Sequence, residues 1–259
     1  MHRLDTDAIR RSVDETATAK LDDLEIFEEI ASTNSYLMQA PVPVPGQVRV
    51  AATDNQTAGR GRHGRTWQSP PGSGLCLSMA YTFTERPANL PALTLAMGLG
   101  AVETMQALSI TGIQLKWPND LVFMDGKLGG ILTETQAQAG ESVTVVTGIG
   151  LNIDLGERVD FRLETDAPLP VVDLKRHVVE LPDRNRIAAT LVSGMTKTFI
   201  DYEAGGFGVF AERWAKHDWL LGRELIVDLA QRQISGVGAG VADDGALLID
   251  TPSYGRHRV

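Results

Sequence analysis

The chain of 259 residues has one cysteine, Cys76, and five histidines, none of which is four residues from another. A single thiol cannot form an intrachain disulfide or supply the cysteine cluster of a structural zinc site. Low cysteine content is typical of a reducing compartment, so we expect a cytoplasmic location. Cys76 lies in an apolar, strand-like segment, which favours a core position over a role as a nucleophile.

Long apolar runs are also missing. The most apolar stretch, residues 93–102, is far shorter than the ~20 residues that a membrane-spanning helix needs. The first residues, MHRLDTDAIRRSVDET, are too charged for a secretory signal peptide. Lys and Arg total 24 against 33 Asp and Glu, a net charge of −9, and an acidic chain is a poor general binder of nucleic acid. We therefore expect neither a membrane nor DNA as a partner.

Common catalytic signatures are missing too. The sequence contains no P-loop motif G-x-x-x-x-G-K-[ST] and no G-x-S-x-G nucleophile elbow. Gly59, Gly61 and Gly64 do match G-x-G-x-x-G, but Trp67 and residues 70–72 (Pro-Pro-Gly) follow where a dinucleotide-binding fold needs a helix. The pattern therefore argues against a Rossmann domain.

What remains is an ordinary globular composition, 43% hydrophobic and 22% charged, in a chain long enough to bury a core. Periodicity predicts helices over residues 5–20, from 33 onwards, and over 91–108, 185–202 and 207–219, with strands over 48–53, 75–83 and through 113–150. From residue 222 only short strands and tight turns follow. The sequence therefore predicts an α+β body, with a mixed sheet and flanking helices, and a small β-barrel-like module at the end.

Residues 56–67, QTAGRGRHGRTW, carry the densest chemistry. Glycines let backbone amides approach a ligand closely, and the guanidinium groups of Arg60, Arg62 and Arg65 suit phosphate. Three like charges so close repel one another, so we expect an anionic ligand to order this loop. On this segment alone, a solvated basic loop or an RNA contact is an equal alternative.

A second constellation is KWPNDLVFMDGKLGGIL at 116–132. A turn at 118–120 brings Lys116 and Asp120 to the ends of adjacent strands. Lys127 follows an Asp-Gly hairpin signal, and the glycines after it leave room for a ligand. Taken singly, this segment is more simply explained as a hairpin with a surface lysine. GIGLNID at 148–154 is a third piece, weak alone.

In this order the segments resemble the biotin protein ligases, the enzymes that biotinylate carboxylases. The resemblance runs from about residue 25 to the end, and the β-rich tail resembles the family's SH3-like domain. It implies an N-terminal extension over 1–24, a catalytic domain over 25–220 and an SH3-like domain over 221–259. The matching pieces are STN (32–34), QTAGRGRHGRTW (56–67), SGLCLS (73–78), KWPND (116–120), KLGGIL (127–132) and GIGLN (148–152).

Some members of this family carry an N-terminal DNA-binding module. The 31 residues before Ser32 are acidic and resemble members without it. We therefore expect a monofunctional ligase without repressor activity; the resemblance allows a homodimer. Lipoate ligases and octanoyltransferases share the core fold but differ in the arginine-rich loop.

The resemblance implies a two-step reaction. Biotin and MgATP give biotinyl-5′-adenylate and pyrophosphate, and the biotinyl group then passes to a lysine of a biotin carboxyl carrier protein or domain of acetyl-CoA carboxylase or a related enzyme. Attack of a carboxylate on a phosphate brings two anions together, so cations are required. Lys127 and Arg62 are the implied catalytic residues. A lipoate-type ligase or a non-catalytic biotin- or nucleotide-binding protein remains an alternative.

The resemblance also implies binding residues. Those for biotin are Ser32, Thr33, Asn34, Gln56, Gly59, Arg60, Gly61, Arg62, Lys127, Gly129 and Gly130. Those for ATP are Arg60, Arg62, Arg65, Trp67, Lys116, Asn119, Asp120, Lys127 and Asn152, with Asp120 as the candidate ligand of Mg²⁺. An arginine near the family's C-terminal end reaches the ATP phosphates, for which Arg256 and Arg258 are both candidates. A loop ordered over the adenylate would also keep water from it.

Overall fold

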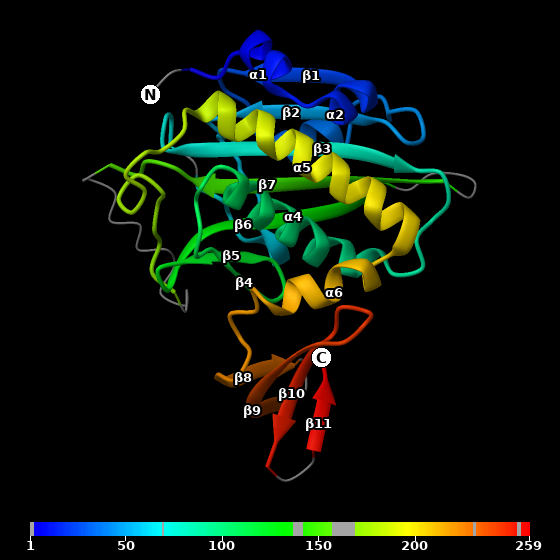
Figure 1. Ribbon diagram of the computed structural model, residues 1–259, viewed down its shortest axis with the longest axis vertical. Coiled ribbons are helices and arrows are strands. Elements are labelled where there is room, and N and C mark those ends of the chain that lie inside the picture. Colours follow the sequence, from blue (N-terminus) through cyan, green and yellow to red (C-terminus); the bar gives the residue numbers. More distant parts are fainter. Residues whose placement is uncertain (1–2, 69, 137–141, 157–168, 230–231, 253–254) are drawn as a thin grey trace.

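A computed structural model describes residues 3–68, 70–136, 142–156, 169–229, 232–252 and 255–259. A seven-stranded sheet with helices against it forms the body, and a separate four-stranded sheet lies at the C-terminal end (Figure 1). The predicted α+β class, with a mixed sheet, flanking helices and a small terminal β module, is confirmed.

The body sheet has the strand order β1-β2-β3-β7-β6-β5-β4. Strands β1 and β2 are parallel, and every other neighbouring pair is antiparallel. The strands are β1 (Leu21–Phe27), β2 (Val48–Thr53), β3 (Gly74–Phe83), β4 (Gln114–Lys116), β5 (Asp120–Phe123), β6 (Gly126–Gln136) and β7 (Val143–Asn152).

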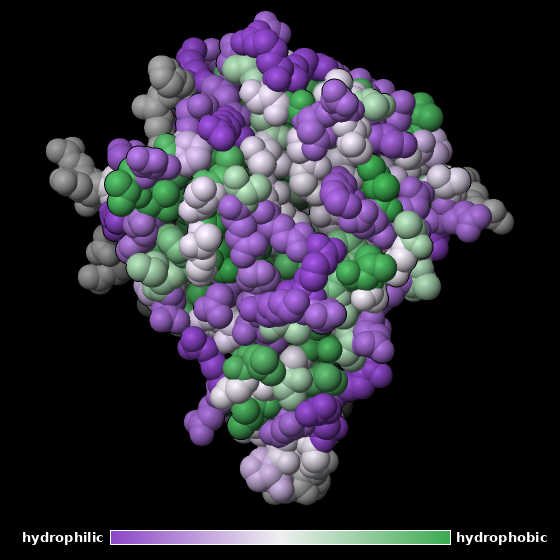
Figure 2. All heavy atoms as spheres, in the orientation of Figure 1, coloured by the Kyte–Doolittle hydropathy of each residue, from purple (hydrophilic) through white to green (hydrophobic). Residues whose placement is uncertain are grey.

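Long helices cover one face of this sheet. Helices α4 and α5 lie across it in Figure 1, and hydrophilic side chains predominate on the outer surface of that side (Figure 2). The helices are α1 (Thr6–Ser12), α2 (Glu15–Lys20), α3 (Thr33–Leu37), α4 (Leu93–Ala107), α5 (Arg184–Gly205) and α6 (Gly208–Ala215), with 3₁₀ turns η1 (Arg62–Gly64) and η2 (Leu90–Ala92).

Alternation along the strands separates the two faces of the sheet. On β3, Leu77 and Met79 join the large core beneath α4 and α5. Ala80, on the other face of β3, packs with Leu37 of α3 instead. Helix α3 therefore covers part of the face opposite α4 and α5. The even-numbered residues nearer the start of β3, Cys76 and Ser78, lie on the same face but are not part of this apolar cluster.

The C-terminal sheet has the order β11-β10-β9-β8 and is antiparallel throughout. Its strands are β8 (Glu224–Leu229), β9 (Arg232–Val241), β10 (Leu247–Thr251) and β11 (Gly255–Arg258). Trp117 of the body packs on the small core of this sheet, and its Nε1 donates to the carbonyl of Gly245 at 3.0 Å. The predicted domain boundaries stay predictions, and β1 spans the first of them.

Two local predictions were wrong, and one strand was missed. Residues 5–20 form two helices, because Val13 leaves the helical conformation and the Asp14 side chain caps a new one. Strand β1 was not predicted, because its acidic residues interrupt the apolar alternation. The helix predicted over 207–219 ends at Ala215, where the chain turns towards the small sheet. In the described part of the chain, no helix could cross a membrane.

Candidate active site

A cavity of about 740 Å³ opens on the α3 face of the body sheet, a volume typical of small-molecule sites. Its floor comes from β3, β6 and β7, and its walls from the start of α3, a hairpin at residues 59–67, the β4–β5 turn and the edge of the small sheet. The lining includes Ser32, Thr33, Asn34, Gln56, Arg60, Gly61, Arg62, Arg65, Trp67, Cys76, Ser78, Lys116, Asn119, Asp120, Lys127, Gly130, Gly148, Gly150, Asn152, Val227 and Asp228.

Small residues make the floor concave. Gly150 of β7 pairs with Cys76 on one side and with Gly130 on the other. In the next row, Gly148 pairs with Ser78 and with Leu132. Because alternate residues share a face, these two rows point into the same cavity, and five of their six residues are Gly, Ser or Cys.

The arginine-rich segment folds as a tight hairpin. The amide of Trp67 donates to the carbonyl of Gly59 at 3.0 Å, and that of Gly61 to the carbonyl of Arg65 at 2.7 Å. A side chain at Gly59 would clash with the Trp67 carbonyl, and one at Gly150 would meet the Trp67 ring at under 3.0 Å. The hairpin therefore rests on β7 through Trp67, which places its arginines over the cavity.

A polar network lines the α3 end of the cavity. The backbone amide and hydroxyl of Thr33 both donate to Gln56 Oε1, at 2.8 and 3.2 Å. The Thr33 and Ser78 hydroxyls are 2.7 Å apart, and Ser78 donates to Asn34 Oδ1 at 2.6 Å. Ser32 begins the helix, its hydroxyl accepting from the Ser35 amide. The network fixes which donors and acceptors face a ligand.

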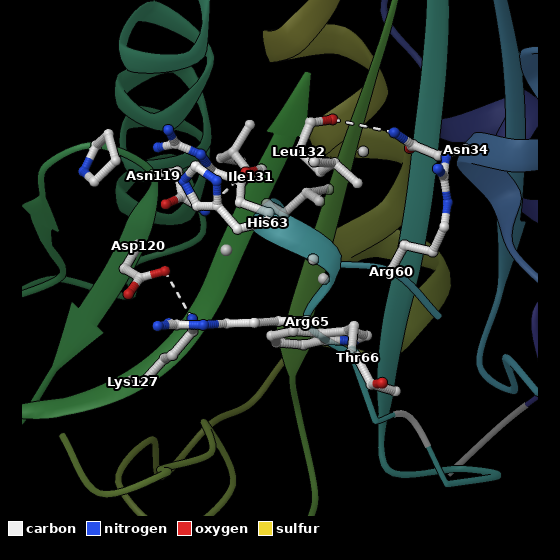
Figure 3. A pocket seen from close by; sticks show the side chains of 18 of the residues that line it. Asn34, Arg60, His63, Arg65, Thr66, Asn119, Asp120, Lys127, Ile131 and Leu132 are labelled. Atoms are coloured by element: carbon white, nitrogen blue, oxygen red, sulfur yellow. Dashed lines mark hydrogen bonds and ion pairs between the residues drawn. The ribbon is translucent and has the colours of Figure 1, made fainter. Parts of the chain in front are cut away.

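Asn34 is held on three sides. Besides accepting from Ser78, its Nδ2 donates to the Leu132 carbonyl at 3.2 Å and to Glu134 Oε2 at 3.0 Å. Arg60 Nη2 reaches the same carboxylate oxygen at 2.5 Å. Figure 3 shows Asn34 and Arg60 together at one end of the cavity.

The opposite end is cationic. Lys127 Nζ lies 2.7 Å from Asp120 Oδ1, an ion pair visible in Figure 3. Lys116 and Asp120 lie at the ends of adjacent strands, as predicted, and the structure makes them register partners. Burial lowers the pKa of Lys116, Asp120 opposes this shift, and Lys127 and Arg65 add to it. Burial also lowers the pKa of Arg62, again opposed by Asp120. One carboxylate thus sits among four cations, an arrangement that favours a polyanionic ligand.

Two asparagines hold the backbone around Lys127. Asn119 Nδ2 donates to the Ile131 carbonyl at 3.0 Å. Asn152 Nδ2 donates to the Val172 carbonyl at 3.1 Å and to the Lys127 carbonyl at 3.4 Å. Their amide groups therefore brace β6, although both residues also line the cavity.

The structure gathers the predicted site residues into this cavity with two exceptions. Gly59 lies at the base of the hairpin, and Gly129 points to the other face, against Leu121 and Leu151. Arg256 and Arg258 are paired with Asp250 and Asp244 in the small sheet and are not in the lining. Cys76 is buried, as expected, but its position is in the cavity floor.

Sequence reasoning missed several residues. Ser78, Gly148 and Gly150 lie in segments that carried the resemblance, and strand alternation places them on the face of Asn152. Glu134 lies past the end of KLGGIL, but the same alternation from Gly130 would have found it. Nothing in the sequence indicated that Val227 and Asp228 of β8 would reach the cavity.

No group of three or more His, Cys, Asp or Glu side chains in the described part of the chain could hold a metal ion by itself. Asp120 is a single carboxylate within the cationic end. A divalent cation bound there would therefore depend on oxygens of a ligand for most of its coordination.

Comparison with known proteins identifies a matching family, related sequences and a similar solved structure. The family model described as biotin/lipoate A/B protein ligase matches residues 26–152. The bifunctional ligase/repressor BirA of Salmonella typhimurium is 32% identical over 95% of this chain and 73% of its own length. The biotin–[acetyl-CoA-carboxylase] ligase of Mycobacterium tuberculosis is 32% identical over 88% of this chain and 83% of its own. A solved structure, biotin protein ligase from Aquifex aeolicus in complex with biotin and ATP, matches with a TM-score of 0.75 at 25% identity, covering 92% of this chain and 95% of that one.

Proposed function

The chain belongs to the biotin protein ligases of the biotin/lipoate A/B protein ligase family, and we propose that it biotinylates a carrier protein in two steps. Biotin and ATP give biotinyl-5′-adenylate and pyrophosphate; a lysine of a biotin carboxyl carrier protein or domain then takes the biotinyl group and releases AMP. The observation that carries this proposal is one cavity with two different ends. The α3 end offers hydrogen-bonding groups and is neutral overall, because Glu134 offsets the charge of Arg60, whereas the opposite end is cationic.

The neutral end suits the uncharged ureido ring of biotin. Gln56 uses its oxygen for Thr33, so its amide nitrogen is left to donate to a ligand. Ser32 and Thr33 add hydroxyl groups at the start of α3. A site built to hydrogen-bond such groups discriminates strongly against ligands that lack them, lipoate among them.

The cationic end suits the junction of carboxylate and phosphate. An oxygen of the biotin carboxylate attacks the α-phosphorus, the new O–P bond forms, and pyrophosphate leaves with the electrons of the broken P–O bond. We assign Lys127 to the α-phosphate and the biotin carboxylate, where it would offset their repulsion and the charge that develops. Arg62, Arg65 and Lys116 would bind the remaining phosphates.

Further residues of the cationic end would contact the nucleotide. Asn119 and Asn152 hold the β6 backbone that carries Lys127, and Trp67, packed on Gly150, offers an aromatic face to the nucleotide. In the second step the neutral amine of the carrier lysine attacks the carbonyl carbon of the mixed anhydride. AMP departs with the C–O bonding electrons, and the nitrogen releases one proton to solvent as the amide forms. Lys127 is placed to stabilise that departing phosphate.

Asp120 fits a magnesium ion brought by ATP. Magnesium is usually held by one or two carboxylates together with substrate phosphates, and Asp120 is a carboxylate at the cationic end. We propose that Asp120 is its protein ligand and that Lys127 leaves Asp120 for the ligand when both bind. The ion would neutralise phosphate charge.

The remaining assignments extend the proposal. We propose that the chain acts in the cytoplasm, on the basis of its single cysteine, and that it acts without DNA, on the basis of its charge of −9. A homodimer stays a prediction. The expected protein partner is a biotin carboxyl carrier domain of acetyl-CoA carboxylase or a related carboxylase.

The decisive experiment is the mass of a biotin carboxyl carrier domain after incubation with the chain, ATP and biotin. We expect the mass to rise by one biotinyl group on one lysine, and only when all components are present. In parallel reactions, lipoate replaces biotin. No mass change with biotin, or an equal change with lipoate, would contradict the proposed function.

A further inference from the structure

Glu134 connects two parts of the cavity that are far apart in the sequence. Its Oε2 accepts from Arg60 Nη2 at 2.5 Å and from Asn34 Nδ2 at 3.0 Å. A single carboxylate oxygen thus joins the arginine hairpin to the first turn of α3. Neither of these partners is a neighbour of Glu134 along the chain.

The position of Glu134 on β6 explains this reach. Glu134 follows Gly130 and Leu132 on the cavity face and pairs with Val146 of β7. Its side chain is 25% exposed and that of Arg60 is 42% exposed. An ion pair in such a half-shielded place is stronger than one on the open surface.

The other arginines of the hairpin face different charges. Arg62 is attracted electrostatically by Asp120, and Arg65 is close enough to Lys116 for the two positive charges to repel each other. Glu134 offsets the charge of Arg60 and also accepts from Asn34. Figure 3 shows Arg60 beside Asn34. The hairpin therefore distributes its cations between the two ends of the cavity, although the sequence alone treats them as one cluster.

We propose that Glu134 is a positioning residue of the neutral end, where biotin would bind. One oxygen of Glu134 holds both Arg60 and Asn34, and this keeps Arg60 apart from the cations that would bind the phosphates. This inference rests on the proposed function. Without the carboxylate, Asn34 keeps only the Leu132 carbonyl as acceptor for its amide nitrogen, and the Arg60 guanidinium is free to move towards a polyanion. Biotin binding should then suffer while ATP binding does not.

The test is steady-state pyrophosphate exchange in the full-length chain, with biotin varied at saturating ATP and ATP varied at saturating biotin. The variants are Glu134→Ala, Glu134→Gln, Arg60→Gln and the double variant Glu134→Ala/Arg60→Gln. Glu103→Ala is the matched control, since Glu103 pairs with Arg213 at 2.7 Å outside the cavity lining. Urea midpoints establish that each variant is folded.

We expect Glu134→Ala to raise the KM for biotin about tenfold, as loss of charged hydrogen bonds does, with kcat and the KM for ATP little changed. Glu134→Gln, which keeps an acceptor oxygen, should show a smaller rise. In the Arg60→Gln background, Glu134→Ala should add less than its effect alone, because the two residues act as a pair.

Three results would overturn the inference: an unchanged KM for biotin in folded Glu134 variants, an equal rise in the KM for ATP, or effects that multiply fully in the double variant. A wild-type chain without biotin-dependent exchange would instead overturn the proposed function, and this inference with it. The two failures are therefore distinguishable.

Discussion

Arg184, the first residue of α5, is buried and donates from Nη1 to Asp54 Oδ2 at 2.7 Å. Asp54 directly follows β2, where the segment that carries Gln56 and the arginine hairpin begins. The other end of the guanidinium group donates to the Gly72 carbonyl, just before β3. One helix residue therefore holds both ends of the segment that forms much of the cavity wall.

Replacing Arg184 with Met should destabilise the fold by about 2 kcal/mol. Loss of a partner leaves a carboxylate poorly solvated, and the partial exposure of Asp54, 22%, limits the penalty. The free energy of unfolding in urea measures this. Arg213→Met is the matched control, because its pair with Glu103 is far more exposed and should be worth under about 1 kcal/mol. Equal losses in both variants would contradict the role of burial.

Lys127→Ala should reduce biotin-dependent pyrophosphate exchange by about a hundredfold or more, as removal of one transition-state donor does. The fold should persist, since Lys127 is not part of the core. Lys197→Ala is the control, because Lys197 is exposed on α5 and forms an i,i+4 ion pair with Asp201 on the same helix. Wild-type exchange rates in Lys127→Ala would remove this residue from the chemistry.

Substitutions at two glycines of β7 should impair the binding of biotin and the binding of ATP separately. A Cβ at Gly148 would lie under 3.0 Å from Asn34 Oδ1, and one at Gly150 would lie under 3.0 Å from the Trp67 ring. We expect Gly148→Ala to raise mainly the KM for biotin and Gly150→Ala mainly the KM for ATP, each by about tenfold, from the penalty of overpacking.

Gly208→Ala provides the control for these glycine variants. A Cβ at Gly208, at the start of α6, would meet no atom within 4 Å. Its kinetic constants should equal those of the wild type. If Gly148→Ala and Gly150→Ala raised both KM values alike, the cavity would not be divided as proposed.

Lys116 should give ATP binding an alkaline limit. Burial lowers the pKa of this lysine from 10.5, so it loses its proton at a lower pH than an ordinary lysine. The KM for ATP should rise as pH passes the lowered value, and Lys116→Arg should move that rise to higher pH. The free energy of unfolding should change in the opposite direction from ATP binding. Below the lowered pKa of Lys116, its partly buried charge destabilises the folded state, and this destabilisation is relieved as pH rises from the lowered pKa towards 10.5.

The measurement is the KM for ATP over a series of pH values from neutral to alkaline, in wild type and Lys116→Arg. Urea midpoints over the same series follow stability. Identical alkaline profiles in the two proteins would show that another group sets the limit.

Sequence patterns located most elements because their signals are local. Apolar alternation predicted β3 and β7, and the Asp-Gly turn before Lys127 predicted the β5–β6 hairpin. Strand β1 escaped prediction because its stability comes from pairing with β2 rather than from its own acidic sequence. Long-range pairing of this kind leaves little trace within the segment itself.

For the site, motifs located residues but not their partners. The sequence grouped Arg60 with Arg62 because they are two residues apart, whereas the structure pairs Arg60 with Glu134, which is 74 positions away. Gly129 and Gly130 looked alike in the sequence, yet successive strand residues face opposite sides of a sheet, and only Gly130 lines the cavity. The contact of Arg60 with Glu134 depends on the tertiary fold, and the difference between Gly129 and Gly130 depends on alternation along β6.

Trp117 links the turn that carries Asn119 and Asp120 to the small terminal sheet, through its bond to Gly245. A second tie lies nearby, where Asp125 accepts from Trp219 and Arg223. A tilt of the terminal sheet would either break these contacts or displace the turns before and after β5, which carry Trp117 and Asp125. If the terminal sheet has a second orientation with other contacts, binding at the proposed nucleotide end would be linked to that orientation. The factor by which a ligand there shifted the sheet would then equal the factor by which the sheet's orientation changed the ligand's affinity.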